Sequence, residues 1–199
     1  MLSLMRPTEA ALADYLESCA EREFSYATPG MVQNLGPDEP VPEGWTVDIN
    51  RRELVSDPEA FERAREALDR FAMFDMPWIE LCRRSGPLAV GTNVATLTWH
   101  FGLWALNPCR VIDVIDEPER YGFLYGTLDG HLVCGEERFL VERDKEGGVS
   151  LEIQAWSRPA TWLSRSMRPY LRYLQGCFGR EAPSHFAAAI ESNVMAESA

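Results

Sequence analysis

The segment from residue 88 to residue 158 constrains the fold most, because it alternates β-forming residues with very short connections. Val, Ile, Thr and aromatic residues dominate it, and turn-forming residues interrupt it repeatedly. The pattern predicts strands near 91–101, 108–116, 120–128, 132–143 and 148–157. Strands joined by so few residues pair as antiparallel neighbours, since a parallel crossover needs about a dozen residues or more. A Rossmann-type sheet is therefore excluded.

Helical periodicity flanks this region on both sides. Apolar residues recur at three- and four-residue spacing within 8–23, 57–73 and 162–178. Thr8 is placed to cap the first helix, and either Ser56 or Asp57 is placed to cap the second. In the third segment Pro169 either kinks the helix or marks its start.

The predicted elements assemble into an α+β fold. Residues 27–44 contain four prolines and three glycines, which indicates a long loop, and 45–50 alternates as a sixth strand. A curved antiparallel sheet with a bare apolar face needs a cover, and the helix at 162–178 supplies one. We therefore predict a helix-grip, in which a sheet of about six strands wraps around a long C-terminal helix. Such a fold leaves a cavity where the facing side chains do not fill the space.

The length of 199 residues fits a single domain. We divide it into an N-terminal helical extension (1–26), a helix-grip core (27–178) and a C-terminal tail (179–199). Pro183 interrupts the helical pattern in this tail, so we expect at most a last turn of helix near 185–195.

Four motifs in the second half of the chain carry a resemblance to a known family. They are Asn107–Val111, Gly122–His131, Gly135–Phe139 and Ala155–Trp162. Together they resemble DUF1990, an uncharacterised family, and the resemblance extends from about Phe24 to Gln175. That family is similar to the START and birch-pollen-allergen superfamily, so the resemblance implies a helix-grip with an apolar ligand cavity and no established activity. The chain departs from the family pattern at 55–58 and again at 179–183, which affects the helix ends.

Composition excludes several classes of function. The net charge of −12 argues against general binding of nucleic acid, because phosphates would be repelled. Lys145 is the only lysine, in an Asp-Lys-Glu-Gly-Gly turn, which leaves no good candidate for a Schiff base or a phosphate-binding loop. Five widely spaced cysteines without a C-x-x-C pair indicate reduced thiols in a cytoplasmic protein. We predict no metal, no cofactor, no secretory signal and no transmembrane segment.

Glu137 is the first candidate site residue. Strand alternation places it on the inward face with Phe139 and Val141, whereas Glu136 shares its face with Arg138. A buried carboxyl needs a partner or a raised pKa. Glu137 is therefore either a polar anchor or general base in the cavity, or half of a structural ion pair with an arginine, Arg110 or Arg158.

The other candidates are ligand-binding residues around the same cavity. They are Arg110, Tyr125, His131, Ser157 and Arg158. An arginine in an apolar strand forms an ion pair with an acidic side chain, lies at the solvent-exposed end of the strand, or holds the carboxylate or phosphate of a ligand. Tyr125 needs a partner for its hydroxyl, and His131 is a possible acid or base at the cavity mouth. Ser157 shares the inward face of its strand but lacks a nucleophile elbow.

Three functions remain open. The first is binding of a small apolar or amphipathic molecule in the cavity. The second is an enzyme of the same fold that uses Glu137 or His131 as acid or base on a lipid-like or polyketide-like substrate. The third is a structural or interaction protein whose side chains fill the interior. Five arginines between 158 and 180 form either a solvated face or a surface for anionic membranes, and the oligomeric state is open.

Overall fold

The computed structural model of the chain describes residues 1–31, 41–55 and 57–197. Half of the expected loop at 27–44 lies outside these ranges, as do the capping candidate Ser56 and the last two residues of the expected tail. No helix among the described residues is both long and apolar enough to cross a membrane.

One antiparallel sheet forms the body of the molecule, in the order β2-β8-β7-β6-β5-β4-β3, with β1 paired to β5. Its strands are β1 (Leu2–Ser3), β2 (Thr46–Glu53), β3 (Ile79–Arg83), β4 (Asn93–His100), β5 (Leu103–Glu117), β6 (Arg120–Thr127), β7 (Val133–Arg143) and β8 (Val149–Pro159). The predicted meander and its outer strand β2 are confirmed. The described residues form a sheet of eight strands and not about six, because β1 and β3 were not predicted.

The helices are α1 (Glu9–Ser18), α3 (Ala60–Asp69), α4 (Trp162–Ser166) and α5 (Arg168–Glu197), with short 3-10 helices at Cys19–Glu21 and Ala72–Phe74. Thr8 caps α1 as predicted, since its side chain accepts the N–H of Ala11. Asp57 accepts the N–H of Glu59 just before α3. Pro169 lies at the second residue of α5 and so marks its start, where a missing N–H costs nothing.

The C-terminal helix is longer than the sequence predicts. α5 continues through Gly179 and Pro183 to Glu197, so the expected break after 178 is wrong. Phe186 and Ile190 on this extension are fully buried in the main core. Burial of these two side chains outweighs the one backbone hydrogen bond that Pro183 cannot make.

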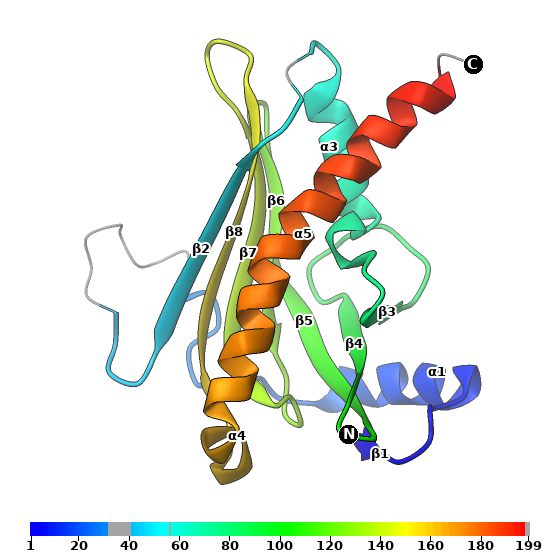
Figure 1. Cartoon of the computed structure of the whole chain (residues 1–199), viewed down its shortest axis with the longest axis vertical. Coiled ribbons are helices and arrows are strands. Elements are labelled where there is room, and N and C mark those ends of the chain that lie inside the picture. Colours follow the sequence, from blue (N-terminus) through cyan, green and yellow to red (C-terminus); the bar gives the residue numbers. More distant parts are fainter. Residues whose placement is uncertain (32–40, 56, 198–199) are drawn as a thin grey trace.

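Two layers of helix cover the two faces of the sheet. α5 crosses one face diagonally, with α3 beside its upper half (Figure 1). α1 lies at the lower end and packs through Leu12 and Leu16 in a cluster with Ala95 and Leu97 of β4. Since strand neighbours point to opposite faces, Thr96 of the same strand points toward α5, where it lines a cavity.

Gly176→Ala is expected to stabilise the protein by up to about 1 kcal/mol, because glycine in a helix interior costs roughly that much relative to alanine. A Cβ at Gly176 meets only the flexible end of Arg180, at 3.3 Å. Urea denaturation measures the change. Gly179→Ala is the matched control: its Cβ would come within 2.6 Å of the Asn50 side chain, so the gain should shrink or reverse.

Candidate functional site

A cavity of about 470 Å³ lies between the first half of α5 and the sheet. Its wall is largely apolar, and its apolar lining includes Phe74, Trp78, Leu132, Ala155, Leu174 and Phe178. Gly179 is the last residue of α5 that lines the cavity. Beyond it α5 packs directly on the core through residues such as Ala182 and Phe186, so the cavity lies under the lower half of the helix. The volume exceeds that of a water molecule many times and falls in the range of small-molecule sites.

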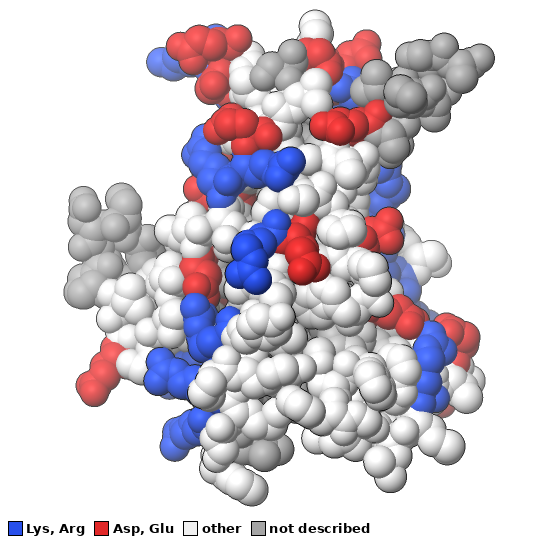
Figure 2. Space-filling view, viewed as in Figure 1, with Lys and Arg blue, Asp and Glu red and all other residues white. Residues whose placement is uncertain are grey.

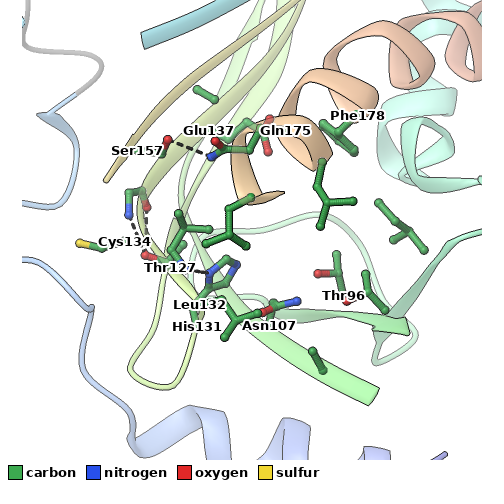
Figure 3. A pocket seen from close by; sticks show the side chains of 18 of the residues that line it. Thr96, Asn107, Thr127, His131, Leu132, Cys134, Glu137, Ser157, Gln175 and Phe178 are labelled. Atoms are coloured by element: carbon green, nitrogen blue, oxygen red, sulfur yellow. Dashed lines mark hydrogen bonds between the residues drawn. The ribbon is translucent and has the colours of Figure 1, made fainter. Parts of the chain in front are cut away.

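Glu137 lies in this cavity wall, on the face that strand alternation predicts (Figure 3). The Tyr125 hydroxyl donates a hydrogen bond of 2.6 Å to its Oε2. Its other oxygen, Oε1, has no hydrogen-bond partner among the described residues. Burial raises the pKa of Glu137 to about 7; the bond from Tyr125 opposes this rise, and the Asp48 carboxylate adds to it. Glu137 is thus a half-buried carboxyl in the cavity wall that titrates near neutrality.

Tyr125 faces the cavity beside Glu137, its partner in the β6–β7 ladder. Burial, and next the negative charge of Glu137, raise the pKa of Tyr125 well above its usual value. The phenol therefore stays protonated, and its O–H donates its hydrogen bond to Glu137.

His131 also lines the cavity, in the turn between β6 and β7 (Figure 3). Its Nδ1 accepts the N–H of Val133 at 3.0 Å, so in the neutral ring the proton is on Nε2. Burial lowers the pKa of His131 to about 4, and the ring is neutral at physiological pH. The residue can donate one hydrogen bond but is a weak base.

Ser157 lines the cavity too, as predicted from its strand face, and joins a chain of polar contacts between sheet and helix. Gln175 Nε2 donates to Ser157 Oγ at 2.9 Å, and Arg172 donates to Gln175 Oε1 at the same distance. The Arg172 guanidinium binds both oxygens of Asp48 on β2. This chain holds α5 over one side of the cavity.

The two predicted arginine sites lie elsewhere. Arg110 donates to Asn93 Oδ1 and to the carbonyls of Cys19 and Ala20 at the end of the N-terminal helix, outside the cavity. Arg158 is exposed and stacks on the Trp45 ring. Neither arginine pairs with Glu137, so the alternative of an ion pair between them is wrong, and neither lies where a ligand head group in the cavity would need it.

Several polar cavity residues were not predicted. Asp48, Thr96, Asn107 and Gln175 all line the cavity. Asn107 is 8 % exposed, and its Oδ1 has no hydrogen-bond partner in the described part of the chain. Its position between Leu106 and a proline in an apolar strand was the only available signal. Glu136 points to the other face, where it accepts the N–H groups of Gly30 and Met31.

The described residues give little support for metal binding or for a nucleophilic cysteine. No cluster of three or more His, Cys, Asp or Glu suited to a metal ion occurs among the described residues. Burial raises the pKa of Cys109 well above its usual value, so its thiol is a poor nucleophile. All five cysteines are free.

The cavity reaches the surface at the lower end of the molecule. Phe101 and Leu2 line it and are 73 % and 50 % exposed. Tyr170 at the start of α5 packs against Phe101 with the two rings tilted by 52°, and it shares a 2.8 Å hydrogen bond with His100. On this face charged side chains gather at the upper end and along the edges, and the lower middle carries few of them (Figure 2). The mouth is therefore predominantly apolar.

Comparison with known proteins identifies relatives over nearly the whole chain. A family model described as "Domain of unknown function (DUF1990)" matches residues 25–184. The UPF0548 protein of Deinococcus radiodurans is 38 % identical over 200 residues, which cover 94 % of this chain and 96 % of that protein. The UPF0548 protein of Dictyostelium discoideum is 29 % identical over 210 residues, with 97 % of each chain covered.

A solved structure shares the fold. The crystal structure of the di-domain ARO/CYC protein BexL, from the BE-7585A biosynthetic pathway, matches with a TM-score of 0.54 at 11 % sequence identity. The match covers 75 % of this chain and 51 % of BexL, and at this identity it shows the helix-grip fold alone. Since the family model spans most of the chain and the bacterial relative covers nearly all of it, this protein belongs to the DUF1990 family.

Proposed function

We propose that this protein binds a small apolar or amphipathic molecule in the cavity between the sheet and α5. The observation that carries the proposal is a cavity of about 470 Å³ whose wall is mostly apolar and contains a half-buried carboxyl, Glu137. Ligand sites have this character: apolar walls give affinity, and a few polar groups fix orientation. A cavity of this size also argues against an interior filled by side chains.

Acid–base catalysis in the same cavity is the second candidate, and the Glu137 carboxyl favours it. A carboxyl with a pKa of about 7 is suited to exchange protons near neutral pH. His131 is the weaker candidate, because burial holds its pKa at about 4. Turnover of a lipid-like or polyketide-like molecule that stops in Glu137→Gln would distinguish catalysis from binding.

Filling the cavity is expected to abolish ligand binding. Ala155 on β8 faces Glu137 across the ladder and lines the cavity, so Ala155→Phe places a ring where the ligand lies. The neutral fluorescent probe N-phenyl-1-naphthylamine should bind the wild-type protein with enhanced emission. In Ala155→Phe its affinity should fall roughly tenfold or more.

Ala160→Phe is the matched control, since Ala160 is exposed just beyond the end of β8. It should bind the probe as the wild-type protein does. No probe binding to the wild-type protein, or equal binding to both variants, would count against the cavity as a ligand site. Thermal melts of both variants check that each one folds.

A further inference from the structure

We propose that the cavity takes an apolar molecule whose polar end is a hydrogen-bond donor, an alcohol or an amine, and discriminates against carboxylates and phosphates. This inference rests on the proposed binding function and specifies the ligand for the same site. It is carried by the charges and the open hydrogen-bonding positions of the cavity wall.

The described part of the cavity wall contains acids and no lysine or arginine side chain. Its described lining residues include Asp48, Glu136 and Glu137, and none of them is a lysine or an arginine. The charges of the three acids are not equally available. Glu136 is turned to the opposite face, where backbone N–H groups bind it, and Asp48 is neutralised by Arg172. Of these three described acids, Glu137 is the carboxyl whose charge acts on a bound molecule.

Arg172 does not supply a site for an anion. Its guanidinium binds both oxygens of Asp48 and also Gln175, so its donors toward the cavity are already used. The predicted anion holders, Arg110 and Arg158, lie outside the cavity wall. A ligand carboxylate would lose its water, gain no cation and face the Glu137 carboxyl, and each of these costs free energy.

When Glu137 is ionised, as it is at pH 8, its open hydrogen-bonding position is an acceptor. Tyr125 occupies Oε2, and Oε1 has no partner in the described structure, which leaves it for a donor on the ligand. A ligand hydroxyl or ammonium satisfies this oxygen, and the ammonium also gains from its charge. Another polar group of the wall, His131, is neutral and offers Nε2–H, which suits the oxygen of an alcohol but does not neutralise an anion.

A series of ten-carbon amphiphiles tests this choice of ligand. Displacement of N-phenyl-1-naphthylamine is measured at pH 8 with 1-decanol, decylamine, sodium decanoate and the donor-free methyl nonyl ether. Decanol and decylamine should bind tighter than the ether, and decanoate roughly tenfold or more weaker than decanol. Decanoate binding as tightly as decanol would overturn the inference and leave the binding function intact. If neither the probe nor any amphiphile binds, the binding function itself fails.

Glu137→Gln separates the effect of charge from that of shape. Glutamine keeps an oxygen for Tyr125 and removes the charge, so decylamine should lose affinity and decanoate should gain it, each roughly threefold or more, while decanol changes least. Glu142→Gln, on the same strand but outside the cavity wall, should leave the order and spacing of the affinities unchanged. Unchanged affinities in Glu137→Gln would overturn the assignment to this carboxyl.

Discussion

Glu137→Gln is expected to be more stable than the wild-type protein at pH 8, by about 3 kcal/mol, and nearly equal to it at pH 4.5 and below. Burial moves the pKa of this carboxyl from its ordinary value of 4.5 to about 7 in the folded state. The folded protein therefore holds a proton that the unfolded chain has released between these two values. Stability falls as pH rises through this window, and the full cost is present above pH 7.

Urea denaturation of both proteins from pH 4.5 to pH 8 measures the effect as a difference between two curves, in which all other titrating groups cancel. Glutamine keeps the hydrogen bond from Tyr125, so the difference reports ionisation of the carboxyl. Parallel curves would show that Glu137 ionises as easily in the folded protein as in the unfolded chain.

Tyr125→Phe provides a comparison of opposite sign at the same site. The hydrogen bond from Tyr125 holds the pKa of Glu137 below the value that burial alone would give. Its removal should raise that pKa further, extend the loss of stability to higher pH and so enlarge the total loss. Glu137→Gln should flatten the pH dependence of the free energy of unfolding, and Tyr125→Phe should enlarge it. Equal pH dependence in the two variants would mean that the Tyr125–Glu137 hydrogen bond does not control this ionisation.

Local sequence pattern was sufficient for the parts of the fold that repeat over several residues. Five strands with short turns specify an antiparallel meander, and alternation along β7 placed Glu137 on the inner face. The same alternation put Ser157 in the cavity wall. Each of these predictions needs only the period of a strand and the side of the sheet that is covered.

Contacts between residues far apart in the sequence could not be predicted from local pattern. Arg110 binds the carbonyls of Cys19 and Ala20, about ninety residues away, and nothing near Arg110 in the sequence indicates them. β3 has five residues and becomes a strand by pairing with β4, so its short alternation was not distinctive. Asn107 was missed because a single buried amide, whose Oδ1 has no partner among the described residues, leaves no periodic signal.

Phe186→Ala is expected to destabilise the protein by about 3–5 kcal/mol, the usual cost of removing a fully buried phenylalanine. Phe186 lies beyond Pro183, where the sequence predicted a tail, and packs into the same core cluster as Phe71, Phe123 and Phe139. Its truncation leaves a cavity and loses the burial that keeps α5 on α3 past the proline.

Tyr173→Ala is the matched control on the same helix. Tyr173 is 63 % exposed, so its removal should change the free energy of unfolding by about 0.5 kcal/mol or less. Urea denaturation at pH 7 compares the two variants. Equal, small effects would mean that the helix beyond Pro183 contributes little to the core. A large effect confined to Phe186→Ala would mean that the second half of α5 anchors the helix, while its first half forms the roof of the cavity.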